Sequence, residues 1–242
     1  MIGIVSAGFN PPSSLTLEEI EFLRKCEHII VDTFTSPFYM KAFEGKNLTF
    51  AERERLEDFS WIFDLSGNVG IVISGDSFSA TTHFNIYKES LKLNRDVRVF
   101  HNATIVPIAA TRFGLHLYKI GPVISLPRFS DKFRPTSPYL KIMENVKNGL
   151  HSIILLDTNP PMDLNEALDE LLWLEKEMKQ GLFSDEIKLG IVSSLGMQNE
   201  KIVYGKIKQI SSLTATPPIT IILPGELHFQ EKENLSLFEL FY

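Results

Sequence analysis

The sequence has a single cysteine, Cys26, and no long apolar run. One cysteine excludes a disulfide within the chain and a cysteine-rich metal site, and its place in LRKCEHIIVD predicts a packed thiol near a helix end. No stretch approaches the ~18 apolar residues of a membrane-spanning helix. The apolar start MIGIVSAGF also lacks the basic residues that open a signal peptide. We therefore expect a cytoplasmic protein that has no membrane partner.

The chain also has no excess of basic residues. With 24 Lys and Arg against 30 Asp and Glu, the formal net charge is −6, so there is no basic footprint for nucleic acid. Hydrophobic residues make up 44% and charged residues 22%, which is the balance of a folded globular chain. At 242 residues the chain has room for one large or two modest domains.

In the first half, apolar runs alternate with helix patterns. A capping signature, Thr16-x-x-Glu19, precedes apolar positions at helical spacing and predicts the first helix. The apolar runs predict strands in MIGIVSAGF, EHIIVDTF, NVGIVIS and DVRVF. This strand–helix rhythm predicts a parallel, doubly wound sheet in a first domain, residues 1–118.

The rhythm is interrupted at KIGPV, and we expect a second α/β domain over residues 119–242. A helix over 137–149 should end at Gly149, and a long helix over 164–181 should be closed by Gly181. The acidic side chains of that long helix predict a solvated face. The strands of the second sheet are predicted in PVISLP, HSIILLD, KLGIVSS, KIVYGKIKQI and ITIILP.

In open α/β sheets, ligands bind beyond the carboxyl ends of the strands. That rule nominates residues 6–9, 74–83, 101–105 and 156–159. In GDSFSATTH, Asp76 could accept hydrogen bonds from a ribose or an amino group, or it could cap the helix that follows. Dinucleotide, phosphate-loop and nucleophile-elbow motifs are missing, and no zinc-binding histidine pair occurs. We therefore expect no metal. His116 and His228 are interpreted as hydrogen-bonded structural residues.

Five segments occur in the order and spacing of one known family: GDSFSATTH, GLHLYKIG, RPTSPYLKIMENVKNGLHSIILLD, NEALDELLWLEKEMKQGLFSD and PPITIILPGELHFQEKENL. The chain thus resembles the archaeal diphthine synthases, which belong to the tetrapyrrole-methylase-like (class III) methyltransferases. The resemblance implies two α/β domains with a cofactor cleft between them, in a homodimer. It also implies transfer of several methyl groups from S-adenosyl-L-methionine, which leaves as S-adenosyl-L-homocysteine, to the amino group of a modified histidine on translation elongation factor 2, a step in diphthamide biosynthesis.

The same resemblance implies which residues contact the cofactor. At motif positions of this sequence they are Phe9, Asp76, Ser79, Thr104, Ile105, Leu156, Leu195 and Ile219. No residue is assigned a catalytic role, because an amine need only be unprotonated and positioning supplies most of the rate in a methyl transfer.

The sequence departs from the family pattern at several turns. Ser6 and Ser77 stand where glycine and proline are usual, and Pro107 and Thr111 stand where smaller residues or glycine are usual. These departures keep two alternatives open. One is a related methylase of small tetrapyrrole or corrinoid precursors, and the other is a non-catalytic, cofactor-binding homologue.

Overall fold

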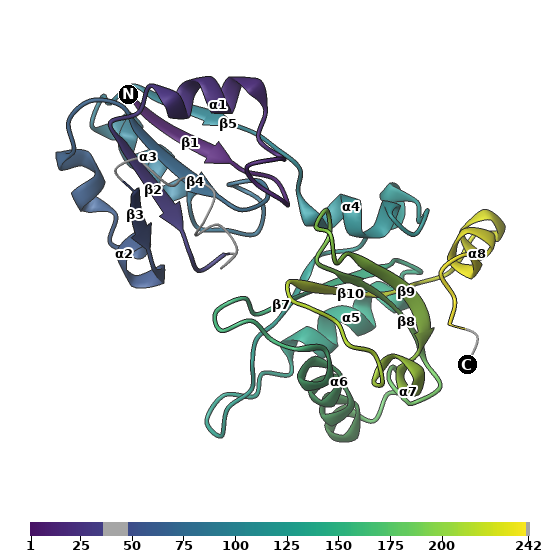
Figure 1. Ribbon diagram of the computed structural model, residues 1–242. Coiled ribbons are helices and arrows are strands. Elements are labelled where there is room, and N and C mark those ends of the chain that lie inside the picture. Colours follow the sequence, from purple (N-terminus) through teal and green to yellow (C-terminus); the bar gives the residue numbers. More distant parts are fainter. Residues whose placement is uncertain (36–47, 241–242) are drawn as a thin grey trace. The chain divides into compact units, whose positions relative to one another are not determined.

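The computed structural model of the chain describes residues 1–35 and 48–240, and it divides into two compact units, Met1–Thr104 and Ile105–Tyr242 (Figure 1). The sequence placed the domain boundary at 118/119, whereas this division falls at 104/105. The difference arises because helix α4 (Ile105–Thr111) has its neighbours in β7 (Ser152–Leu156) and β10 (Ile219–Leu223) of the second unit.

The first unit is a five-stranded parallel sheet with the strand order β3-β2-β4-β1-β5. The predicted parallel sheet is confirmed, and β3 is a strand that the sequence reading missed. The elements are β1 (Ile2–Ser6), α1 (Leu17–Arg24), β2 (His28–Asp32), β3 (Leu48–Ala51), α2 (Arg53–Glu57), η2 (Ser60–Asp64), β4 (Val69–Ile73), α3 (Phe84–Lys92) and β5 (Val97–Phe100).

Both faces of this sheet are buried, because successive strand side chains point to opposite sides. Val5 and Val72 pack on one face with residues of α1, and Cys26 belongs to this core, as predicted. Ile4 and Ile71 pack on the other face with residues of α2, η2 and α3. Figure 1 shows α1 and α2 on opposite sides of the strands. The sheet is therefore covered on both faces, and its carboxyl edge is left for the connecting loops.

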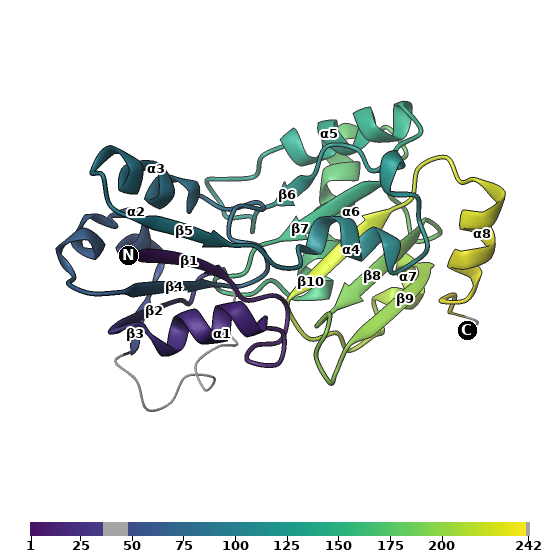
Figure 2. The ribbon, with the colours of Figure 1, turned by 90° about the horizontal axis from the view of Figure 1, so that it is seen from above.

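The second unit has a mixed sheet in the order β6-β7-β10-β8-β9, with β6 parallel to β7 and the other neighbours antiparallel (Figure 2). Its long helix α6 packs its leucines on this sheet. The remaining elements are η3 (Leu117–Lys119), β6 (Ile124–Leu126), α5 (Ser137–Lys147), α6 (Leu164–Met178), β8 (Lys188–Ser193), β9 (Lys201–Lys206), α7 (Ile207–Ile210) and α8 (Phe229–Ser236).

Three local expectations for this unit are corrected. The helix predicted to close at Gly181 ends at Met178, and Lys179 takes the left-handed cap with φ 54°. The end of the predicted strand KIVYGKIKQI is helix α7. The acidic face of α6 is not simply solvated, because Glu170 is buried and Glu175 accepts hydrogen bonds from Tyr139 and from backbone N–H groups. The helix end at Gly149 is confirmed, with φ 68°.

Among the described helices the longest is α6, with 15 residues, and none is both long and apolar enough to cross a bilayer. Within the same described part of the chain, no group of three or more His, Cys, Asp or Glu side chains is arranged to hold a metal ion.

Candidate functional site

Two turns meet at the carboxyl edge of the first sheet. Gly8, after β1, and Gly75, after β4, exchange backbone hydrogen bonds of 3.1 and 2.9 Å, and each has φ 65°. A side chain at Gly8 would also collide with Ser14, whose Cβ would lie 2.9 Å from the added atom. Glycine is therefore required where the first turn passes close to its neighbours.

The two unusual serines are partners of one another. The Ser6 Oγ accepts a hydrogen bond from the Ser77 backbone N–H at 2.9 Å, and the two hydroxyls are also 2.9 Å apart. Both residues are fully buried. A proline at 77 would lack this N–H and a glycine at 6 would lack the acceptor. The two departures from the family pattern thus compensate each other and tie the two turns together.

Asp76 does not cap a helix. Its Oδ1 accepts from the Phe78 backbone N–H at 3.1 Å, which closes a tight turn, and α3 begins only at Phe84. Its Oδ2 lies 2.8 Å from Nδ1 of His101, the residue that follows β5. The alternative that Asp76 caps the following helix is therefore excluded. Its carboxylate is held in place by a backbone donor and an imidazole.

Ser79 and Thr104 lie next to each other, although 25 residues separate them, and their hydroxyls are 2.5 Å apart. The neighbouring Asn102 donates to the backbone oxygen of Ser14 at 3.0 Å, which fastens the loop after β5 to the first turn. Phe9 is half-buried on that first turn. Four of the predicted contacts, Phe9, Asp76, Ser79 and Thr104, thus belong to turns that leave this one edge.

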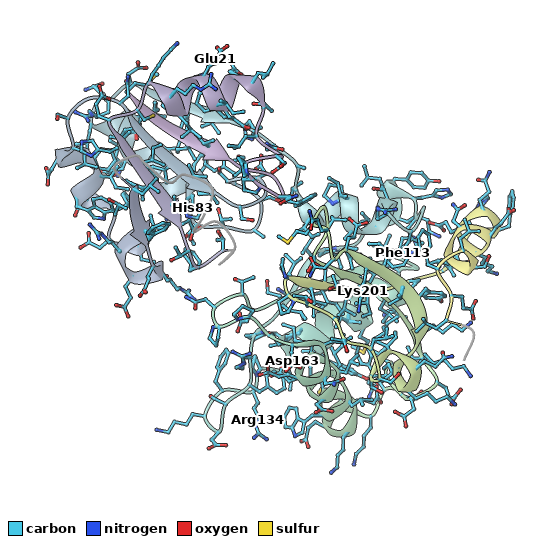
Figure 3. All side chains as sticks on the ribbon, in the orientation of Figure 1. Glu21, His83, Phe113, Arg134, Asp163 and Lys201 are labelled. Atoms are coloured by element: carbon cyan, nitrogen blue, oxygen red, sulfur yellow. The ribbon has the colours of Figure 1, made fainter. Side chains whose placement is uncertain are left out.

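The segment GDSFSATTH ends at a buried histidine, His83. His83 is 2% exposed, and its Nε2 lies 3.4 Å from the Asp32 carboxylate at the end of β2 (Figure 3). Among the described residues neither ring nitrogen of His83 has a hydrogen bond of good geometry. Burial lowers the pKa of His83, and the charge of Asp32 opposes that effect. The pair joins the GDSFSATTH loop to the chain that leaves β2.

The predicted contacts of the second unit also share an edge. Leu156 is the last residue of β7, and Leu195 follows β8. Ile219 begins β10 and pairs with Ser193. Because β10 is antiparallel to β7 and β8, its start lies beside their ends. Ile105 is the first residue of α4 in this unit.

Beside Leu156 lies a cluster of charges that the sequence reading missed. The Arg128 guanidinium is bound by both carboxylate oxygens of Glu166, and the Arg128 backbone N–H donates to Asp157 at 2.7 Å. The hydrogen bond from Arg128 lowers the pKa of Glu166. Burial raises the pKa of Glu170, which accepts from the Phe129 N–H at 2.6 Å. The acids of α6 therefore hold the loop that follows β6.

A second group that the sequence did not reveal is centred on Glu231 of α8, which is fully buried. Its carboxylate accepts from the backbone N–H groups of His116 and His228, both at 2.8 Å, from His151 Nε2 at 2.9 Å and from Lys119 at 3.2 Å. Burial opposes ionisation, but these donors outweigh it and lower the pKa of Glu231 to about 2. The segments GLHLYKIG, GLH and PGELH thus converge on one carboxylate, to which His116 and His228 donate backbone hydrogen bonds.

The first edge has groups that suit an adenosyl sulfonium cofactor. Gly75 has φ 65°, and among the described residues an added side chain there would meet only the Ala103 carbonyl, at 3.7 Å, so a ligand can come close to the backbone. The Asp76 carboxylate is 13% exposed and can accept further hydrogen bonds from hydroxyl or amino groups. The residues present therefore fit such a cofactor.

Comparisons with known proteins show which family the chain belongs to. The sequence profile of the tetrapyrrole (corrin/porphyrin) methylases matches residues 1–211. Diphthine synthase of Thermoplasma acidophilum is 31% identical over 98% of this chain and 95% of its own length. Diphthine methyl ester synthase of Bos taurus is 29% identical over 99% of this chain and 95% of its own length. The crystal structure of an Entamoeba histolytica protein assigned as a diphthine synthase superposes with a TM-score of 0.85, at 26% identity, over 99% of this chain and 98% of that chain. The chain belongs to the tetrapyrrole methylase family of methyltransferases and, within it, to the diphthine synthases.

Proposed function

We propose that the protein transfers methyl groups from S-adenosyl-L-methionine to the amino group of the modified histidine of translation elongation factor 2, in diphthamide biosynthesis. The observation that carries this proposal is the edge of the first sheet, where Asp76, Ser79 and Thr104 meet the Gly8–Gly75 turn pair. These acceptors and close-packed turns suit the cofactor, and positioning of the cofactor supplies most of the rate.

The extent of the similarity favours a protein substrate over a small corrinoid precursor. The general methylase profile matches residues 1–211, whereas the diphthine synthase of Thermoplasma acidophilum aligns over 98% of this chain. The segment beyond residue 211 includes α8 and Glu231, which holds His116 and His151 in the described geometry. These parts of the second unit support assignment to diphthine synthases rather than to other tetrapyrrole methylases.

The test is a transfer assay with S-adenosyl-L-methionine labelled in its methyl group. Elongation factor 2 that carries the 3-amino-3-carboxypropyl histidine should become labelled, and the same factor with an unmodified histidine is the control. A corrinoid precursor should remain unlabelled. Absence of transfer to the modified factor would refute the proposal, and binding of S-adenosyl-L-homocysteine without any transfer would favour a non-catalytic homologue.

A second candidate product has one additional methyl group as a carboxylate ester. It is favoured by the relatives named diphthine methyl ester synthase, such as the Homo sapiens protein, which is 28% identical over 99% of this chain. Mass spectrometry of the modified peptide counts the methyl groups. Mild alkali removes an ester methyl and leaves N-methyl groups in place, so the two products are distinguished in one experiment.

We further propose that the protein acts in the cytoplasm, and that it forms the homodimer that the resemblance to diphthine synthases implies. Light scattering coupled to gel filtration should give twice the mass of the 27.5 kDa chain. A monomer at micromolar concentration would contradict this assembly.

A further inference from the structure

One ring nitrogen of His101 is hydrogen-bonded within the described part of the chain, and the other is not. Its Nδ1 lies 2.8 Å from the Asp76 carboxylate, while its side chain remains 65% exposed. A carboxylate oxygen can only accept, so Nδ1 carries a proton. In the neutral ring the lone pair is then on Nε2, for which the described residues offer no hydrogen-bond partner.

The carboxylate that orients this ring is itself held. Asp76 Oδ1 accepts from the Phe78 N–H at 3.1 Å, and the Phe78 ring packs against His101 with the centroids 6.0 Å apart. Among the described residues, Asp76 is the charged group in contact with the imidazole. A base that is oriented by a carboxylate through its other nitrogen is the arrangement that serves proton transfer in many enzymes.

The reaction has a proton to remove. An alkylammonium group has no lone pair with which to attack a methyl group, so each transfer to nitrogen releases one proton to the surroundings. His101 follows β5 at the same edge as Ser79 and Thr104 and three residues before Thr104. The proton acceptor and the candidate cofactor contacts are therefore on neighbouring turns.

We propose that His101, oriented by Asp76, accepts the proton from the substrate ammonium before each methyl transfer. This inference rests on the proposed function. The proton passes from nitrogen to His101 Nε2, and the freed lone pair forms the N–C bond. The C–S bond of the methyl donor breaks and its electron pair remains on sulfur, while His101 returns its proton to solvent.

The experiment compares single-turnover methyl transfer by the wild-type protein, His101→Ala and His101→Gln between pH 6 and 10, at saturating cofactor. His28→Ala is the matched control, because His28 begins β2 at the amino end of the same sheet. At pH 7 the rate of His101→Ala should fall by about 10²-fold or more, which is the usual contribution of a general base. The deficit should shrink at high pH, where the amine loses its proton unaided, and added imidazole should restore part of the rate at pH 7.

A second readout needs no activity. Long-range ¹H–¹⁵N spectra should show His101 of the wild-type protein protonated on Nδ1, and Asp76→Asn should shift the ring towards the other tautomer. Calorimetry should show that His101→Ala binds S-adenosyl-L-homocysteine within about threefold of the wild type.

The outcomes separate the two proposals. If the wild type transfers no methyl group to the modified factor, the proposed function fails and this inference fails with it. If the wild type is active, only the role of His101 is in question. Four results would each overturn the role of His101 and leave the proposed function standing. They are a rate deficit of His101→Ala that is the same at every pH, no rescue of that rate by imidazole, loss of cofactor binding, and a wild-type ring protonated on Nε2.

Discussion

Replacing Glu231 by glutamine removes the charge on which the donors of four residues in the second unit converge. The amide offers one acceptor oxygen and presents its own N–H groups to some of these donors, so buried partners lose their hydrogen bonds. The fall in the Glu231 pKa from its ordinary 4.5 to about 2 corresponds to about 3 kcal/mol at 1.36 kcal/mol per unit. We expect Glu231→Gln to lower the free energy of unfolding of the second unit by about 3–5 kcal/mol.

The two tryptophans allow each unit to be followed separately. Trp61 lies in the first unit and Trp173 lies on α6 of the second. In a Trp61→Phe background, urea unfolding monitored by fluorescence reports the second unit. In a Trp173→Phe background it reports the first. Glu233→Gln is the matched control, because Glu233 lies on the same helix and is exposed.

The dependence on pH gives an independent check. A carboxyl with a lowered pKa stabilises the folded state above its unfolded value of 4.5, and that contribution is lost as the pH falls towards about 2. The difference between the wild type and Glu231→Gln should therefore be full at pH 7 and reduced to roughly half by pH 3. A loss no larger than that of Glu233→Gln, or an equal loss in the Trp61-reported unit, would refute the reasoning.

Three further substitutions test other parts of the structure. Asp76→Ala should weaken binding of S-adenosyl-L-homocysteine by about 1–2 kcal/mol in calorimetry, whereas exposed Asp64→Ala should not; unchanged affinity would remove Asp76 from the site. Ser6→Ala should destabilise the Trp61-reported unit by about 1–3 kcal/mol, because it leaves the buried Ser77 N–H without its acceptor. Ser77→Ala should destabilise this unit less than Ser6→Ala, since the backbone N–H of residue 77 keeps the Ser6 Oγ as its acceptor. A larger loss of stability for Ser77→Ala would contradict this hydrogen-bond assignment. Burial raises the pKa of Glu170, so its charge costs stability as the pH rises from 4.5. Glu170→Gln should therefore match or exceed the wild type at pH 7 in denaturant unfolding, and a clear loss would count against this account.

Local signals were sufficient for many elements. The Thr16–Glu19 spacing predicted a capping box, and the structure contains it, because its hydrogen bonds join residues three apart in the chain. The apolar runs within 2–6, 28–32 and 69–73 predicted parallel strands for a similarly local reason, since a strand buried on both faces is apolar through its interior. In contrast, β3 is only four residues long and partly exposed, and it carries no such signal.

The acids of α6 show where a local pattern misleads. Their helical spacing predicts a charged, solvated stripe. Instead, Glu166 binds Arg128, and Glu170 accepts a hydrogen bond from the Phe129 N–H. Both partners lie in a loop about 40 residues earlier in the chain. A helical pattern shows which side chains share a face, but it does not show what the rest of the fold brings against that face.

The sequence by itself determined the two α/β halves, the family and the residue types at the strand ends, because periodicity and motif order are properties of the chain alone. Only the tertiary structure decided which side chains form hydrogen bonds with one another. Ser6 meets Ser77 across 71 residues, Asp76 meets His101 across 25, and His151 meets Glu231 across 80. A hydrogen bond needs donor and acceptor within about 3 Å and in line, so these pairs depend on the register and packing of the sheets as well as on the residue types, and the sequence shows only the residue types.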